Sequence, residues 1–322
     1  MSYLESTYDL YAGAASTPDV GLCCTTTPIW QLPELEIPAI MLEMNYGCGS
    51  TVHPRDLSGN PSVLYLGVGG GMELLQFAYF SRSKGRIIGV DAVEDMLKVC
   101  RENLDKAAGV NEWFSKDFVD LRKGNALELP IKDASVDIVA QNCLFNIFKQ
   151  SDLDKALSEA YRVLKPRGKL VLSDPICDQK MPEALRDDDH LRALCLSGAI
   201  PFGEYIDRLT EAGFATIEVR ARRPYRVLSS GKYGIQENIF IESIEVAAIK
   251  DPMPADGPCV FTGKTAIYFG SEEYIDDGKG HLMLNNMPLA VCDKTAAQLE
   301  SSGIPDLLIT PSTYFYDGGG CC

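Results

Sequence analysis

The chain has 322 residues, 46% of them hydrophobic, so it can bury a core without help from disulfides or a metal ion. Its 45 acidic and 30 basic residues give a formal net charge of -15. Such a surface repels phosphates and anionic lipids, so we expect neither nucleic acid nor a membrane as a partner. The first ten residues lack the pattern of a signal peptide, and no apolar stretch is long enough to span a bilayer, so we expect a cytoplasmic protein.

Regular structure is expected from residue 61 onward. Prolines at positions 28, 33, 38 and 54 predict an irregular segment over residues 1–60. A short apolar run then predicts a buried strand over 63–66, followed by a helix over about 71–82. The pattern continues with strands over 86–90 and 136–141, separated by a helix with apolar positions from 93 to 104. A capping-box spacing predicts a helix that begins at Ser151, and a strand follows over 169–172.

This alternation predicts an α/β fold, in which a doubly wound, Rossmann-like sheet carries helices on both faces. Residues 183–213 are expected to be helical, and 215–220 to form a late strand. Beyond residue 222 the chain is rich in β-type alternation and glycine. We therefore predict three parts: an N-terminal segment (1–60), a Rossmann-like domain with a helical cap (61–222) and a smaller C-terminal α+β domain (223–322).

A glycine-rich turn joins the first predicted strand to the first helix. Gly67, Gly69 and Gly71 allow a ligand to approach the backbone closely, beside the positive end of the helix dipole. Asp91 stands twenty residues after the last of them, at the end of the second strand, where a carboxylate can accept the hydroxyls of a ribose. Together they predict a nucleoside-binding site. NAD and S-adenosylmethionine both use this arrangement.

Two later segments favour S-adenosylmethionine. Residues 124–130 and 159–168 are similar to motifs of the class I methyltransferases. The resemblance implies that S-adenosylmethionine is the cofactor and that Asn125 and Ala126 hold its adenine. Asn125 stands where many members have aspartate, but its amide oxygen can still accept from the adenine amino group. Tyr65 stands where most members carry an acidic residue.

The chain contains eleven cysteines, which serve in a reducing compartment as core filler, catalytic thiols or ligands for soft ions. Cys143 follows Asn142 at the end of the strand predicted over 136–141, where an open α/β sheet forms its ligand crevice. Cys195 lies in the predicted cap, and Cys48 lies just before the sheet. A structural zinc site is not expected, because no pair of cysteines has the C-x-x-C spacing.

The segments around these three cysteines resemble those of arsenite methyltransferases. The matching motifs are Tyr-Gly-Cys-Gly at residues 46–49, Asn-Cys at 142–143 and Cys-x-x-Gly-Ala at 195–199, within a resemblance that covers about residues 15–220. It implies that Cys48, Cys143 and Cys195 bind trivalent arsenic, and that Tyr46 and Asn142 contact the cofactor.

The same resemblance implies further roles and partners. Cys23 or Cys24 would capture arsenic early or pair reversibly with Cys48. The substrate would be arsenite or an arsenite–thiol conjugate, with glutathione or thioredoxin as the reductant. The C-terminal segment resembles the version found beside arsenosugar biosynthesis, and the closing Cys321 and Cys322 are hypothesised to scavenge arsenic.

The chemistry is consistent with these residue types. Thiolates are soft ligands that select soft ions, and a lone pair on the bound arsenic can attack a methyl group without a general base. Two alternatives stay open. One is a small-molecule O-, N- or C-methyltransferase whose cysteines are incidental, and the other is a non-catalytic thiol protein that sequesters metalloids.

Overall fold

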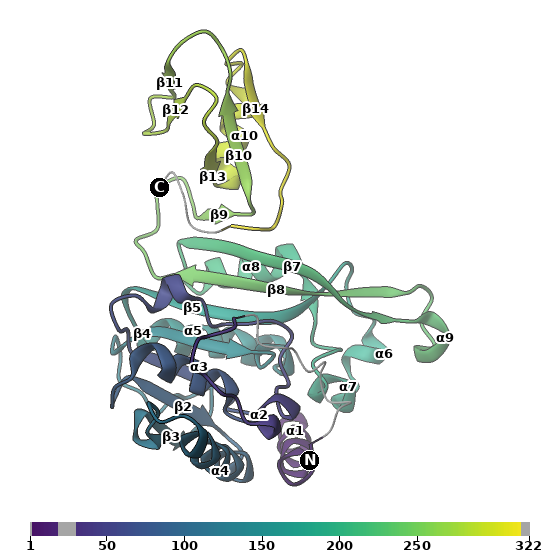
Figure 1. Ribbon diagram of the computed structural model, residues 1–322. Coiled ribbons are helices and arrows are strands. Elements are labelled where there is room, and N and C mark those ends of the chain that lie inside the picture. The colour runs from purple at the N-terminus through teal and green to yellow at the C-terminus, as the bar shows by residue number, and fades with distance from the viewer. Residues whose placement is uncertain (1, 19–29, 317–322) are drawn as a thin grey trace.

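A nine-stranded, mostly parallel sheet forms the centre of the molecule (Figure 1). The computed structural model describes residues 2–18 and 30–316. The main path of the sheet runs β3-β2-β1-β4-β5-β8-β7-β9, and β6 pairs with β5. Its strands are β1 (Val63–Leu66), β2 (Ile87–Asp91), β3 (Val119–Lys123), β4 (Val136–Asn142), β5 (Leu164–Cys177), β6 (Ile200–Pro201), β7 (Thr216–Leu228), β8 (Ile239–Ile249) and β9 (Cys259–Phe261).

Helices cover both faces of this sheet, as predicted for a doubly wound fold. Alternate residues of each strand point to opposite faces, so Val63 and Tyr65 of β1 join one apolar cluster and Leu64 and Leu66 join another. The first cluster includes side chains of α1 (Tyr3–Ser16), α2 (Ala39–Glu43), α3 (Met72–Ser81) and α4 (Glu94–Val110). The second includes side chains of α5 (Gln150–Val163) and α8 (Phe202–Glu211).

Short elements complete the main body. They are the 3-10 helices η1 (Pro54–Leu57), η2 (Lys116–Phe118) and η3 (Phe145–Ile147), and the helices α6 (Glu183–Arg186), α7 (Asp189–Ala193) and α9 (Ser230–Tyr233). None of the helices within residues 2–18 and 30–316 has both the length and the apolar character that crossing a bilayer requires.

A smaller unit follows the central sheet and lies beyond β9 in Figure 1. It contains a three-stranded sheet, a two-stranded hairpin and one helix. Its elements are β10 (Lys264–Tyr268), β11 (Tyr274–Asp276), β12 (Leu282–Leu284), β13 (Leu289–Val291), α10 (Asp293–Ser301) and β14 (Leu307–Ile309).

The C-terminal domain was expected to begin at residue 223, but that residue lies inside β7. Residues 239–249 also belong to the central sheet, as β8.

Two other expectations require correction. Residues 1–60 are not irregular throughout, because α1 occupies Tyr3–Ser16 with a capping box made by Ser2 and Glu5. The prolines named in the sequence analysis all lie after this helix and do not disturb it. The predicted capping box at Ser151 is absent, since α5 begins at Gln150 and its N-cap, Lys149, makes no side-chain cap.

A buried ion cluster fastens η1 to the central sheet. The carboxylate of Asp56 accepts hydrogen bonds from the guanidinium of Arg220 on β7 and, at 2.7 Å, from Lys169 on β5. Burial alone would raise the pKa of Asp56, but the hydrogen bonds and charges of these two partners lower it to about 2. Relative to an ordinary value of 3.8, this shift corresponds to about 2 kcal/mol of stability at neutral pH.

Replacing Asp56 by asparagine is therefore expected to lower the free energy of unfolding at pH 7 by about 3 kcal/mol, because Arg220 would lose a buried partner. The difference from the wild type should shrink as the pH falls from about 4 towards about 2, where the native carboxylate becomes protonated. The urea midpoint of the circular dichroism signal measures both effects. Asp117→Asn is the control, because Asp117 forms an exposed pair with Lys84. If both substitutions lowered the free energy of unfolding equally, this role of Asp56 would be contradicted.

Candidate functional site

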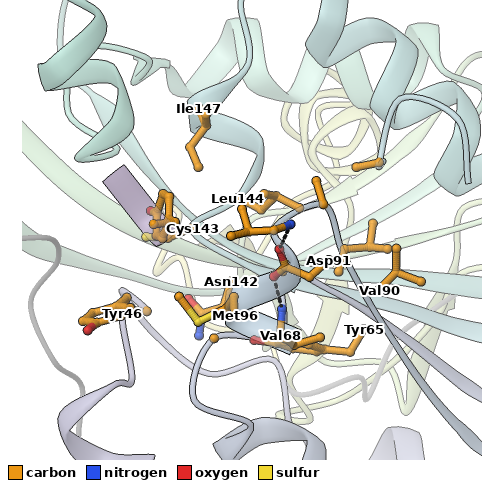
Figure 2. A pocket seen from close by; sticks show the side chains of 18 of the residues that line it. Tyr46, Tyr65, Val68, Val90, Asp91, Met96, Asn142, Cys143, Leu144 and Ile147 are labelled. Atoms are coloured by element: carbon orange, nitrogen blue, oxygen red, sulfur yellow. Dashed lines mark hydrogen bonds between the residues drawn. The ribbon is translucent and has the colours of Figure 1, made fainter. Parts of the chain in front are cut away.

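A cavity opens at the carboxyl ends of the first parallel strands (Figure 2). Its wall includes the ends of β1, β2 and β4, the glycine turn before α3 and the residues that precede the sheet from Met44 to Gly47. Helix α1 adds one side of the wall through Leu4, Thr7, Tyr8 and Tyr11. The cavity therefore lies where the sequence analysis placed the nucleoside, but its N-terminal wall was not expected.

The glycine turn adopts a conformation that other residues avoid. Gly67, Gly69 and Gly71 have φ angles of 75°, 49° and 87°. A Cβ atom on Gly71 would also lie 2.9 Å from the sulfur of Cys100, so a side chain there would collide with α4. All three glycines line the cavity.

Asp91 lies at the end of β2 and holds two backbone segments together. Its carboxylate accepts from the N–H of Val68 in the glycine turn and from that of Val93 before α4, each at 2.9 Å (Figure 2). Burial raises the pKa of Asp91 to about 6, and these backbone donors only partly oppose the effect. Two oxygens provide about four acceptor positions, so Asp91 can still accept a ribose diol.

Asn125 and Ala126 also line the cavity, after β3. The side-chain oxygen of Asn125 accepts from the N–H of Leu127 at 2.9 Å, which fixes the orientation of the amide. A carbonyl oxygen has a second lone pair, which leaves one acceptor position towards the cavity.

A buried carboxylate that the sequence analysis did not identify lies on the other side of β1. The hydroxyl of Tyr65 donates to Glu73 at 2.6 Å, and the N–H of Thr51 donates to the same carboxylate at 2.8 Å. Glu73 lies in the first turn of α3, is 4% exposed and lines the cavity. The sequence does contain a signal for this contact, because Tyr65 in β1 and the acidic Glu73 stand on either side of the glycine turn.

Asn142 connects this carboxylate to the segment before the sheet. Its side-chain NH2 group donates to the carbonyl of Gly49 at 2.9 Å and to Glu73 at 3.3 Å, while its oxygen accepts from the N–H of Cys48 at 3.0 Å. Tyr46 belongs to the same segment and also lines the cavity (Figure 2). The predicted cofactor residues Tyr46 and Asn142 therefore lie against the same cavity as Asp91.

The three predicted arsenic ligands lie in one buried cluster. The thiol of Cys195 donates to the carbonyl of Cys143 at 2.8 Å, and the N–H of Cys143 donates to the carbonyl of Ser173 at 2.8 Å. The hydroxyl of Ser173 also lies 3.3 Å from the sulfur of Cys48. Of the three cysteines, Cys143 lines the cavity itself.

Two of these cysteines adopt left-handed backbone conformations. The φ angles are 59° for Cys143 and 57° for Cys195, a region that costs an ordinary residue about 1 kcal/mol or more. Strain of this kind persists where the surrounding structure fixes it, and it is concentrated at functional sites.

The three thiols are not arranged as a finished metal site. In the part of the chain that the structure describes, no group of three or more His, Cys, Asp or Glu side chains is positioned to hold a metal ion. The predicted roles of Cys23 and Cys24, and of Cys321 and Cys322, lie outside the described residues.

Comparisons with known proteins agree with the fold. A family model described as a methyltransferase domain matches residues 57–234. An arsenite methyltransferase from Aquipseudomonas alcaligenes is 29% identical, over 87% of this chain and 82% of its own length. The human arsenite methyltransferase is 32% identical over 52% of this chain, which spans less than half of that protein.

One solved structure resembles nearly the whole chain. It is an arsenic(III) S-adenosylmethionine methyltransferase from Chlamydomonas reinhardtii, with 25% identity, a TM-score of 0.62 and coverage of 89% of this chain and 99% of that one. These matches agree with the Rossmann-like fold, and the family model extends over more than half of the sequence. The chain belongs to the methyltransferase-domain family.

Proposed function

We propose that this methyltransferase transfers the methyl group of S-adenosylmethionine to trivalent arsenic bound by Cys48, Cys143 and Cys195. The observation that carries the proposal is the position of Cys143, which lines the nucleoside cavity and contacts Cys195 through its carbonyl group. The named activities of the bacterial, human and algal relatives support the same substrate.

The donor is S-adenosylmethionine, and the cavity contains groups suited to its nucleoside. Asp91 accepts the ribose hydroxyls, Asn125 and Ala126 contact the adenine, and Gly67, Gly69 and Gly71 give the backbone room to approach. Tyr46, Asn142 and Cys143 line the same cavity, and we place the sulfonium beside Cys143.

Arsenite, or its conjugate with a small thiol, first exchanges its oxygen or sulfur ligands for the three cysteine thiolates. Arsenite releases three molecules of water, whose protons come from the thiols. The thiol of Cys195 must turn away from the Cys143 carbonyl, which costs one hydrogen bond from a weak donor. Soft sulfur ligands favour this exchange over the binding of hard cations such as Mg²⁺.

The arsenic lone pair then attacks the methyl carbon. A new As–C bond forms, and the electron pair of the broken C–S bond stays on sulfur, so neutral S-adenosylhomocysteine leaves. The positive charge moves from sulfur to arsenic, which becomes pentavalent, and a thiol reductant such as glutathione or thioredoxin returns it to the trivalent state. No proton leaves the nucleophile, which fits a cavity that none of the three histidines lines.

The resemblance of the C-terminal segment to the version found beside arsenosugar biosynthesis supports a proposal about the fate of the product. We propose that the methylated arsenic is delivered to arsenosugar biosynthesis as well as serving detoxification.

Replacing Cys143 by serine is expected to lower the rate of methylarsenic formation by roughly 100-fold or more, because oxygen does not replace a soft ligand and arsenic would be misplaced. The assay supplies arsenite, S-adenosylmethionine and glutathione, and measures arsenic speciation together with S-adenosylhomocysteine.

The matched control for this substitution is Cys177→Ser. Cys177 is buried in a separate apolar cluster, and its thiol donates to the Ala199 carbonyl, which a serine can also do. Methylation of another acceptor that survives in Cys143→Ser and Cys195→Ser would identify a small-molecule methyltransferase instead. Tight arsenite binding without S-adenosylhomocysteine formation would identify a sequestering protein.

Replacing Asp91 by asparagine is expected to weaken S-adenosylhomocysteine binding by about 10- to 100-fold, because the amide NH2 group would face a backbone N–H and the ribose would lose a charged acceptor. Isothermal titration calorimetry measures the affinity. Asp95→Asn, on the exposed first turn of α4, should bind like the wild type. Unchanged affinity in Asp91→Asn would refute the ribose assignment.

A further inference from the structure

The cavity contains two carboxylates, and the donor's ribose uses only one of them. Asp91 ends β2, whereas Glu73 is hydrogen-bonded to Asn142 at the end of β4. Because β1 lies between β2 and β4 in the sheet, the two carboxylates flank that strand on opposite sides. Within the part of the chain that the structure describes, they are the only charged side chains that line the cavity.

Glu73 has hydrogen-bond donors but no cationic partner. Its carboxylate accepts from Tyr65, Thr51 and Asn142, and no Lys, Arg or His within residues 2–18 and 30–316 forms an ion pair with it. Burial raises the pKa of Glu73, although these three hydrogen bonds oppose the effect. A buried carboxylate without a cation is costly, which favours a ligand that brings a positive charge.

The carboxylate also has capacity for one more partner. Two oxygens provide about four acceptor positions. Tyr65, Asn142 and the N–H of Thr51 occupy three of them, and the Thr51 hydroxyl lies near the carboxylate without making a hydrogen bond. The methionine part of S-adenosylmethionine carries an ammonium group, whose N–H donors match such an acceptor. This group should lie on the β4 side of β1, because the ribose belongs to Asp91 on the β2 side and Cys143 follows the end of β4.

Tyr65 holds the carboxylate of Glu73 next to β1. It belongs to this strand, and its hydroxyl donates to Glu73 at 2.6 Å. A carboxylate in the first turn of α3 therefore reaches the space next to β1, and Tyr65 keeps it oriented.

We infer that Glu73, positioned by Tyr65, binds the ammonium group of the donor's methionine moiety, which makes it a donor-binding residue outside the predicted site. The inference rests on the proposed donor but not on arsenic as the acceptor. The competing interpretation is structural, in which Glu73 only holds Thr51 and Asn142 in place.

Two ligands separate these interpretations. S-adenosylhomocysteine carries the ammonium group, whereas 5′-methylthioadenosine keeps the adenosine but lacks the whole amino-acid chain. Calorimetric titration of Glu73→Gln without arsenic should show S-adenosylhomocysteine binding weakened by about 10- to 100-fold, the range expected for a lost charge-assisted hydrogen bond. Binding of 5′-methylthioadenosine should stay within about twofold of the wild type, which also reports that the variant is folded.

Two further variants complete the test. Asp91→Asn should weaken the binding of both ligands by similar factors, because both contain the ribose. Tyr65→Phe keeps the carboxylate of Glu73 but removes the hydroxyl that orients it. The binding of S-adenosylhomocysteine should therefore weaken by a smaller factor, about threefold to tenfold, while the binding of 5′-methylthioadenosine should stay unchanged.

Equal weakening of both ligands in Glu73→Gln, or no weakening of either, would overturn the inference. Failure of the wild type to bind either ligand would overturn it together with the proposed donor. Failure of arsenic methylation with intact donor binding would reject the acceptor and leave the role of Glu73 standing.

Discussion

The amide of Asn142 joins the cavity beside the glycine turn to the segment that contains Cys48, and the remainder of the site depends on it. One side chain bonds to the N–H of Cys48, to the carbonyl of Gly49 and to the carboxylate of Glu73. A Cβ atom on Gly47 would overlap this amide, so the preceding segment passes close against it. Because a buried polar network of this kind is stable only when every member is satisfied, it specifies one arrangement of the segment before the sheet relative to the end of β4.

The parts of the site that follow β1, β2 and β4 could be predicted because their signals are local. Short apolar runs that end in glycine or aspartate mark the carboxyl ends of parallel strands, and parallel strands bring those ends to one edge. Gly67, Gly71, Asp91 and Cys143 all meet the same cavity for that reason. The family match supports the same scaffold over residues 57–234.

The parts that could not be predicted depend on contacts between distant residues. The role of Glu73 follows from its contact with Tyr65, and no periodicity in the sequence reveals that contact. The length of β7 and β8 follows from their pairing with each other and of β8 with β5, which extends the central sheet beyond residue 222. The thiol of Cys195 meets the Cys143 carbonyl across 52 positions of sequence, and only the family resemblance placed these two cysteines together beforehand.

Helix α1 has a consequence for how the protein is made. It precedes the other described elements in the sequence, but it packs against α4 and α7, and the Tyr11 hydroxyl donates to the carbonyl of Ala193, 182 positions later. This wall of the cavity therefore cannot dock until the chain has been synthesised beyond Ala193. Until then the cavity lacks the side that Leu4, Thr7, Tyr8 and Tyr11 of α1 supply.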